Sequence, residues 1–486
     1  MDDLESDVKK EPTFIQALIV FLTVVAILIL GLIVLEVDLH VLLILGLCVA
    51  AVASLILGYK WQDLENAMCN GVSRAMSAMF IFILIGMIVG AWIQAGTVPA
   101  LIYYGLNILS AKIFLPAGLI ICSIASLATG SSWSTVGTVG LALMGIGQGL
   151  GIPPQIIAGM VISGAYFGDK MSPLSDTTNL APISAGTDLY THIKTMMYST
   201  VPTYIICIIL YSFIGFRYGG GQLDVRTVRE IQETLAANFN LNLIVLLPMI
   251  ATLTLSVMKV AAIPAMAIGS FLGSIMAIVF QNATLVETIS VLNYGFEIET
   301  GVEIVDGLLN RGGIQSMMWT FSLAFCALSL GGVLDEMGYM SALVEKITKS
   351  IRKPATLFAA TIISSWISVA AMGEQYLSII LNGRLYKDAY EKEGLTPQML
   401  SRALEEGGTL GSALIPWTTC ATFAAPILGV PTTQYAPWAF LNWMNPLISI
   451  VMTYLGIFVI YKEKEVNKEI NKTDMADEIK LQSFEN

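Results

Sequence analysis

The sequence predicts an all-α polytopic membrane protein with roughly 10–13 membrane elements, two inverted-topology repeats and broken or re-entrant helices. The first observation behind this prediction is composition: 55% of the 486 residues are hydrophobic and only 13% are charged. Soluble proteins carry about 25% charged residues. The chain therefore has too little polar surface for a soluble enzyme, a nucleic-acid binder or a disordered scaffold. The other two observations are the length of the apolar stretches and an internal repeat.

The apolar stretches are long enough to cross a bilayer, which takes about 20 residues per helix. We expect spans at 14–35, 39–58, 76–95, 113–128, 201–217, 241–258, 260–280, 315–334, 355–371 and 438–461. Shorter or interrupted membrane pieces are expected at 131–150, 155–185, 374–382 and 404–430. The long polar loop 283–313 predicts surface helices or turns.

Basic residues in short loops set the expected orientation, because such loops stay in the cytoplasm. They flank four of the expected spans: Lys9, Lys10, Lys60, Arg74, Lys346, Lys349, Arg352, Lys353, Lys462, Lys464 and Lys468. We expect all of them on the cytoplasmic side of the membrane, with both termini in the cytoplasm. Tails at 1–13 and 462–486 would then flank a single membrane domain at 14–461.

An internal repeat relates two parts of the chain by an offset of 243 positions. The residues that coincide without a gap are Gly130/Gly373, Pro154/Pro397, Gln155/Gln398, Gly164/Gly407, Gly168/Gly411 and Pro173/Pro416. Repeat 1 covers about 75–200 and repeat 2 about 315–430. A basic cluster precedes the leading span of the first copy but follows that of the second, so the copies should be inverted. Inverted repeats with broken helices are typical of secondary transporters, with the site at the repeat interface.

The segment 168–182, GDKMSPLSDTTNLAP, interrupts an apolar stretch with charged, hydroxyl and proline residues. Broken backbone within a bilayer is tolerated only where protein buries it or where it lines a watery cavity. The segment therefore predicts a cation site, with Na⁺ at Asp176 and Asn179, and the alternative is an ordinary polar surface loop. Lys170 is expected to form an ion pair with Asp169 or to act as a gate. The candidate ion or proton ligands are Asp169, Ser175, Asp176, Thr177 and Asn179.

The matching segment of the second repeat, 411–425, keeps Pro416 but replaces the charged residues. An asymmetric site of this kind suits one or two monovalent cations rather than a symmetric two-metal centre. Thr418 and Thr419 are expected to complete the coordination. The alternative is that each threonine bonds the carbonyl one turn earlier in its own helix.

A second pair of breaks lies at 129–135, TGSSWST, and at 372–375, MGEQ. Half-helix ends at these positions would point dipoles and hydroxyl groups toward the same interface. Glu374 is the second candidate carboxylate, and its alternative interpretation is a loop residue after a helix capped by Gly373. The hydroxyl candidates of the first break are Thr129, Ser131 and Ser132.

Other charged residues rank lower as ion ligands. Asp335 follows Gly331 and Gly332 at the end of an expected span and is a second-tier candidate. Glu405 and Glu406 are interpreted as helix-dipole partners or solvated residues, because acids near helix starts usually have these roles. We expect no arginine inside the membrane that could clamp a dicarboxylate.

The motifs GDKMSPLSDTTNLAP at 168–182 and TGSSWST at 129–135, with Gly331 and Gly332, resemble the NhaC family of bacterial sodium/proton antiporters. That family also includes members that exchange malate for lactate. The resemblance extends from Phe14 to about Tyr461. It implies a bacterial inner-membrane antiporter driven by ion gradients, in which paired hairpins hold the substrate.

We therefore expect a secondary active antiporter that exchanges Na⁺ for H⁺ by alternating access. The alternative is an organic-anion exchanger coupled to Na⁺ or H⁺, such as a malate/lactate antiporter. Phosphate-binding and nucleophile motifs with supporting context are lacking, which disfavours an ATP-driven pump and an enzyme. The expected partners are Na⁺, H⁺ and the lipid bilayer, with small carboxylates as alternative substrates. Nucleic acid is not expected, a homodimer is left open, and no cofactor is expected besides the transported ions.

Overall fold

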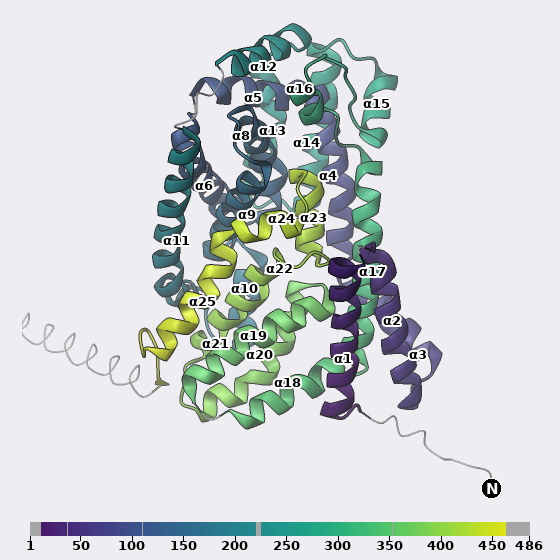
Figure 1. Cartoon of the computed structure of the whole chain (residues 1–486), viewed down its shortest axis with the longest axis vertical. Coiled ribbons are helices and arrows are strands. Elements are labelled where there is room, and N and C mark those ends of the chain that lie inside the picture. The colour runs from purple at the N-terminus through teal and green to yellow at the C-terminus, as the bar shows by residue number, and fades with distance from the viewer. Residues whose placement is uncertain (1–10, 36, 109, 220–224, 352, 463–486) are drawn as a thin grey trace, which may run out of the picture.

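The fold is a bundle of helices, seen in a computed structural model that describes residues 11–35, 37–108, 110–219, 225–351 and 353–462 (Figure 1). Within these ranges, eight helices are long and apolar enough to span a membrane, or nine if a bent pair at 228–257 counts as one span. The prediction of an all-α polytopic membrane protein is confirmed. The predicted tails at 1–13 and 462–486 lie almost wholly outside the described residues, and the domain limits stay a prediction.

The helices run in one continuous series along the chain. The first part contains α1 (Phe14–Ile29), α2 (Leu39–Ile56), α3 (Trp61–Arg74), α4 (Met76–Gln94), α5 (Thr97–Ile108), α6 (Ala111–Thr129), α7 (Ser132–Thr135), α8 (Leu141–Gly149), α9 (Pro154–Met171), α10 (Asp176–Ala185), α11 (Leu189–Gly219) and α12 (Val225–Asn238). The second part contains α13 (Leu247–Val257), α14 (Ala262–Phe280), α15 (Leu285–Tyr294), α16 (Glu303–Leu309), α17 (Met318–Glu336), α18 (Tyr339–Ser350), α19 (Pro354–Met372), α20 (Gln375–Lys392), α21 (Pro397–Leu404), α22 (Leu410–Ser412), α23 (Thr419–Leu428), α24 (Thr432–Tyr435) and α25 (Phe440–Tyr454). Five-residue π-helical turns extend α1 and join α7 to α8 and α21 to α22.

Helix bounds correspond between the two halves under the same offset of 243 positions. α6 maps onto α19, and α10 maps onto α23, without any change in length. Both α6 and α19 end on a glycine in the left-handed conformation, Gly130 at φ 68° and Gly373 at φ 69°. Figure 1 shows α6 and its neighbours in the upper half and α19 with α20 and α21 in the lower half. The two helices therefore approach the centre from opposite ends, as inverted repeats do.

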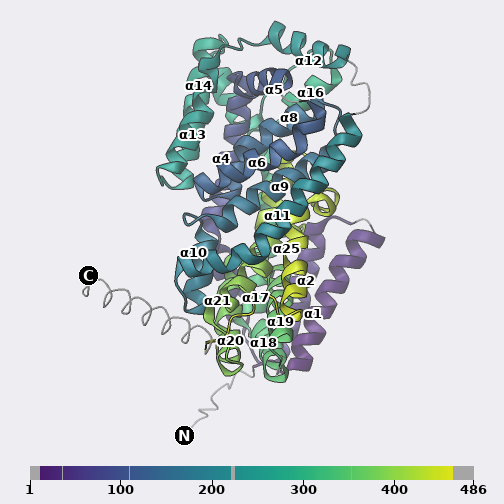
Figure 2. The same ribbon diagram turned by 90° about the vertical axis from the view of Figure 1, so that its left-hand side faces the viewer.

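The two halves are interlocked rather than side by side. α2 of the first half packs on α17, and α14 of the second half packs on α4. Figure 2 shows α13 and α14 at the upper end, while α1 and α2 lie at the lower end. Helices α1 and α2 of the first half therefore lie at the lower end with the second repeat, and α13 and α14 of the second half lie at the upper end with the first repeat.

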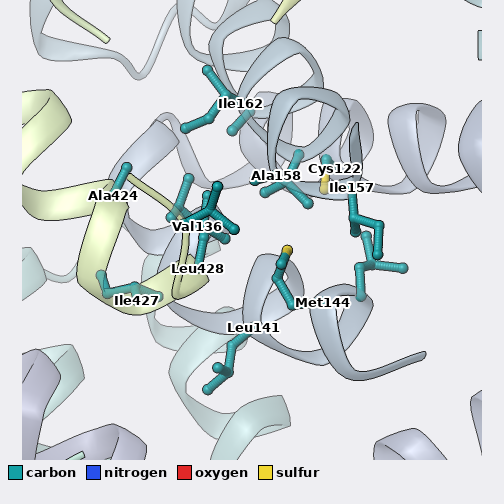
Figure 3. Packing of buried hydrophobic residues seen from close by; sticks show 14 of the residues in the cluster. Cys122, Val136, Leu141, Met144, Ile157, Ala158, Ile162, Ala424, Ile427 and Leu428 are labelled. Atoms are coloured by element: carbon teal, nitrogen blue, oxygen red, sulfur yellow. The ribbon is translucent and has the colours of Figure 1, made fainter. Parts of the chain in front are cut away.

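The largest hydrophobic core also joins the two halves (Figure 3). Val136 and Met144 belong to the α7–α8 helix, and Ile157 belongs to α9. Leu428 of α23, from the second half, packs into the same cluster. A half-helix of one repeat is therefore held by apolar side chains of the other.

Three expected spans differ from the observed helices. The span expected at 241–258 is a 3₁₀ turn at Leu243–Leu246 followed by the short helix α13; the turn starts at Asn242, whose side chain accepts the Ile244 amide at 3.2 Å. This helix bends by 96° relative to α12. The span expected at 438–461 ends at Tyr454, followed by Gly456 in the left-handed conformation at φ 72°. The span expected at 201–217 begins earlier, at Leu189, because α11 continues through Pro202.

The short membrane piece expected at 374–382 is the full-length helix α20. Its second half carries Arg384, Lys387 and Asp388, so its apolar stretch is shorter than the helix itself. The loop 283–313 forms the short helices α15 and α16, as expected.

Two of the basic residues named above, Lys346 and Lys462, lie near the same end of the molecule. Lys346 of α18 sits 4.8 Å from the ring centre of Phe14, at the start of α1. Lys462 bonds Glu391 of α20 at 2.8 Å. The first and last described segments therefore both contact the α18–α20 region, at the lower end of Figure 1. Lys9, Lys10, Arg352, Lys464 and Lys468 lie outside the described residues.

The two helix-ending glycines give a matched test of the fold. An alanine at either position must adopt a left-handed conformation, which costs about 1–2 kcal/mol. A Cβ at Gly130 would also lie 2.6 Å from the Leu174 Cβ, whereas the nearest atom at Gly373 is 3.4 Å away. We expect Gly130→Ala to lower the melting temperature in detergent clearly more than Gly373→Ala, measured by differential scanning fluorimetry. Equal shifts would contradict the close contact at Gly130.

Candidate ion-binding site

A cavity of about 490 Å³ lies where the breaks of the two repeats meet. Its wall is formed by α4, by the α6–α7, α9–α10 and α19–α20 breaks, and by the turn between α13 and α14. Eight of the residues that the sequence indicated line it together: Thr129, Ser131, Ser132, Asp169, Ser175, Asp176, Thr177 and Glu374. Three carboxylates from segments far apart in the chain therefore share one cavity.

The α6–α7 break supplies hydroxyl groups to the cavity. Ser131 is the N-cap of α7 and accepts a hydrogen bond from the Ser134 amide at 3.1 Å. The Ser132 hydroxyl donates to the Asp169 carboxylate at 2.5 Å. Asp169 is only 6% exposed. The Ser132 hydrogen bond joins its buried carboxylate to the α6–α7 break.

The α9–α10 break places Asp176 at the start of a helix. Ser175 is the N-cap and accepts from the Thr178 amide at 3.4 Å, and Asp176 is the first residue of α10. A carboxylate at this position is favoured by the helix dipole, and the Asp176 side chain remains exposed in the cavity. Asn179 is not on the cavity wall. Its amide donates to the backbone carbonyls of Pro173 and Ser175 at 3.0 Å and 2.7 Å, so it stabilises the break instead.

The α19–α20 break buries Glu374. This residue is the N-cap of α20 and accepts from the Tyr376 amide at 3.3 Å. Its other carboxylate oxygen accepts from the Thr419 hydroxyl at 2.7 Å, and the side chain is only 3% exposed. Glu374 is therefore a buried cap facing the cavity, not a surface loop residue.

The two threonines of α23 have different roles. Thr419 reaches the cavity carboxylate Glu374, as described above. Thr418 is the N-cap of α23 and donates to the carbonyls of Ser412 and Ile415. Thr418 is absent from the cavity wall, so its contacts are those of a helix cap.

Exposed residues form one side of the cavity wall, and aromatic rings form another side. Arg74 and Lys259 are exposed residues of its wall. Trp133, also on the wall, stacks on Phe423 with ring centres 4.3 Å apart, and Phe82 lies behind both rings. The stack of Phe82, Trp133 and Phe423, here called the aromatic plug, separates the cavity from the apolar core.

Asp335 does not reach the cavity. Its carboxylate pairs with Arg74 at 2.8 Å, and Glu336 pairs with the same guanidinium at 2.8 Å. Asp335 therefore holds an arginine at the cavity rim and is not an ion ligand in this conformation.

The expected ion pair between Asp169 and Lys170 does not form. Adjacent residues of a helix point about 100° apart, so Asp169 faces the cavity while Lys170 faces away from it. The Lys170 ammonium bonds Asn445 at 2.5 Å and Glu406 at 3.4 Å. Lys170 is fully buried and is not on the cavity wall.

The interpretation of Glu405 and Glu406 as solvated residues or dipole partners is wrong. Both lie in the π-helical turn inside the α21–α22 helix, and both are fully buried. Arg402, also buried, lies 3.9 Å from Glu406, so the membrane domain does contain an internal arginine. We call Lys170, Arg402, Glu405 and Glu406 the buried charge cluster. The Arg402–Glu406 spacing of four residues was the available sequence signal for an ion pair.

The polar groups on the cavity wall suit a small hard cation. They include carboxylates and hydroxyls, together with the C-terminal end of α6, where helix carbonyls lack partners within the helix. Such half-helix ends and unwound carbonyls coordinate Na⁺ in secondary transporters. Among the described residues, no three His, Cys, Asp or Glu side chains are grouped closely enough to hold a metal ion. The hydroxyl groups of the wall are candidate ligands beside the carboxylates.

Comparisons with known proteins show which family and which relatives the chain is similar to. The profile of the Na⁺/H⁺ antiporter family matches residues 164–457. The chain is 41% identical over 464 residues to the Na⁺/H⁺ antiporter NhaC of Alkalihalophilus pseudofirmus, covering 95% of this chain and 99% of that protein. It is 37% identical over 457 residues to the malate-2H⁺/Na⁺-lactate antiporter of Bacillus subtilis, covering 94% and 98%. It is 34% identical over 466 residues to the arginine/ornithine antiporter ArcD of Halobacterium salinarum, covering 95% and 96%.

The buried charge cluster provides a test of stability. Removing one partner of a buried ion pair costs about 3–5 kcal/mol, so Lys170→Met should strongly lower the melting temperature in detergent. Lys462→Met is the matched control, because it breaks an exposed pair with Glu391, and exposed pairs contribute little. Adding Glu406→Gln to Lys170→Met should lower the melting temperature further, because Arg402 then also loses its buried ion-pair partner. Equal effects of the two lysine variants would contradict the burial of Lys170.

Proposed function

The chain belongs to the Na⁺/H⁺ antiporter family, and from this premise we propose that it exchanges Na⁺ for H⁺ across the bacterial cytoplasmic membrane by alternating access. The observation that carries the proposal is the cavity where Asp169, Asp176 and Glu374 meet at the breaks of both repeats. The protein is then a transporter rather than an enzyme, and it needs no cofactor besides the ions it moves.

Na⁺ and H⁺ compete for the same carboxylates in this proposal. Ionised Asp176 attracts Na⁺ into the cavity, where hydroxyls such as that of Ser131 supply neutral oxygens. Protonation of the carboxylate removes its charge and releases Na⁺. The sequence-based ligand pair of Asp176 and Asn179 is revised, because Asn179 bonds the backbone of its own break. Asp169 and Glu374 line the same cavity and contribute to the negative charge around the ion.

The orientation follows from the basic residues at one end. Basic loops stay in the cytoplasm, so the end where Lys346 contacts Phe14 and Lys462 contacts Glu391 faces the cytoplasm. Arg74, exposed at the cavity wall, belongs to the same set of basic residues. The cavity is then open to the cytoplasm, with the aromatic plug on its far side.

An organic-anion exchanger is the second candidate, and two observations favour it. Relatives of this chain are named for malate and lactate exchange and for arginine and ornithine exchange. A cavity of about 490 Å³ has room for a small organic acid, and the N-termini of α10 and α20 could bind its carboxylate. Arg402, the buried arginine, is not on the cavity wall, so it offers no direct clamp.

Sodium-dependent proton movement in proteoliposomes tests the main proposal. Addition of Na⁺ to vesicles containing the purified chain should collapse an imposed ΔpH, followed by a pH-sensitive dye. Because protons compete for the Na⁺ ligands, acidification should raise the apparent KM for Na⁺, by up to about tenfold per pH unit. Asp176→Asn should lose at least about 90% of this activity, since it keeps the shape of the side chain but not its charge.

Asp188→Asn is the matched control for that variant. Asp188 is an exposed aspartate that accepts the Thr191 amide at 2.9 Å near the start of α11, outside the cavity. It should keep near-normal exchange. Full pH-dependent Na⁺ transport by Asp176→Asn would rule out the proposed role of Asp176.

Counterflow separates the two candidate functions. Vesicles loaded with unlabelled malate or lactate should not accumulate the labelled acid if Na⁺ and H⁺ are the only substrates. Accumulation above protein-free vesicles, with loss of the signal in Asp176→Asn, would favour the organic-anion exchanger. Arginine and ornithine are tested in the same way.

A further inference from the structure

The buried charge cluster lies behind the cavity wall and takes no part in the Na⁺ site proposed above. Lys170 comes from α9, whereas Arg402, Glu405 and Glu406 come from α21 and the π-helical turn after it. Each of the four side chains is at most 1% exposed. Two cations and two acids make the cluster formally neutral, but the four groups are not paired evenly.

Glu406 forms ion pairs with both Lys170 and Arg402. The same carboxylate oxygen lies 3.4 Å from the Lys170 ammonium and 3.9 Å from the Arg402 guanidinium. The Ser199 hydroxyl of α11 also donates to it. These contacts bind Glu406 in a structural ion-pair network.

Glu405 has no such partners. Within the described residues, no cation lies within 4.0 Å of its carboxylate, and its Oε2 atom has no hydrogen-bond partner. An ionised carboxylate that is removed from water needs a counterion or several donors. The charged groups that act on Glu405 are Asp169 and Lys170 of α9. The other titratable groups of the cluster region are His192 of α11, which faces Lys170, and Tyr390 of α20, which faces Arg402 and Glu406. Glu405 is thus the one member of the cluster whose environment suits a neutral, proton-bound state.

Two hydroxyl groups link Glu405 to the cavity. The Thr177 hydroxyl donates to Glu405 Oε1 at 3.0 Å. The Ser175 hydroxyl lies 3.2 Å from that of Thr177, and both residues line the cavity. Because each hydroxyl can donate and accept at once, the pair forms a short route for a proton between cavity water and the buried carboxyl.

We infer that Glu405 is a proton-carrying carboxyl of the transport cycle, separate from the carboxylates that bind Na⁺ and reached through Thr177 and Ser175. The inference rests on the proposed Na⁺/H⁺ exchange and deepens it. One proton is exchanged at the Na⁺ ligands and a second at Glu405, so two H⁺ move against one Na⁺. The cycle therefore carries net charge and responds to the membrane potential.

A null-point measurement with the full chain in proteoliposomes tests the inference. The potential is clamped at zero with K⁺ and valinomycin, a tenfold Na⁺ gradient is imposed, and the opposing ΔpH that stops net flux is found. Two protons per Na⁺ balance this gradient at about 0.5 pH unit, and one proton per Na⁺ at about 1 pH unit. We expect about 0.5 for the wild type and about 1 for Glu405→Gln. Glu391→Gln, which changes an exposed glutamate of α20, should stay at the wild-type value.

Three other results of the null-point measurement would overturn the inference or the proposed function. A null point of about 0.5 pH unit in Glu405→Gln overturns the role of Glu405, and a wild-type null point of about 1 overturns the second proton while leaving the antiport intact. A wild type without any Na⁺-dependent proton flux overturns the proposed function itself.

A second variant covers the case in which Glu405→Gln does not fold or transport. Thr177→Val keeps Glu405 but removes the hydroxyl that links it to the cavity. We expect turnover to fall more than tenfold while ²²Na⁺ binding to the purified protein changes less than threefold. Wild-type turnover in Thr177→Val would overturn the proposed route.

Discussion

Every backbone polar group at the centre of this protein must find a partner inside the protein, because lipid offers none. The carbonyls at the end of a broken helix are the most demanding case. In the first repeat, the Ser172 hydroxyl donates to the Leu127 carbonyl near the end of α6 at 2.8 Å. In the second repeat, the Trp417 indole donates to the Ala370 carbonyl near the end of α19 at 2.6 Å. Leu127 and Ala370 are related by the repeat offset of 243 positions. In each repeat, a side chain of the later break therefore donates a hydrogen bond to a carbonyl of the earlier break. These hydrogen bonds hold the two breaks of each repeat together.

Local chemistry made the breaks predictable from the sequence. A glycine that can adopt a left-handed conformation ends α6 and α19, and a hydroxyl residue caps α10 and α23. The positions of the breaks could therefore be predicted from the sequence, although Ser175 and Thr418 were expected as ion ligands and not as helix caps. The partners of buried charges could not be placed in this way. Lys170 meets residues of α25 and of the α21–α22 helix, more than 230 positions away. Only tertiary packing decides which side of a helix such a residue faces.

The two repeats have the same helix breaks, but different side chains occupy the matching positions. Asp176 of the first repeat corresponds to Thr419 of the second, and Ser131 corresponds to Glu374. Thr419 and Glu374 bond to each other, whereas Asp176 stays open to the cavity. The negative charges of the cavity are therefore spread over both repeats, and neither repeat could form the site alone. An ion bound among them is held by groups whose distances change when the repeats move.

The aromatic plug explains why such a movement would switch the open side of the cavity. Trp133 and Phe82 belong to the first repeat, whereas Phe423 lies on α23 of the second. The rings meet by apolar stacking, so a slide of one repeat past the other can part them without breaking a hydrogen bond between them, at the cost of exposing apolar surface. Arg74 joins the repeats at the rim through two charged contacts with Asp335 and Glu336. A shift that separates the rings also changes the Arg74 contacts at the rim, because the first and second repeats meet both at the aromatic plug and at the rim. A movement between the repeats would change both of these contact regions, and it would also have to accommodate the apolar core and the buried charge cluster that join the two halves.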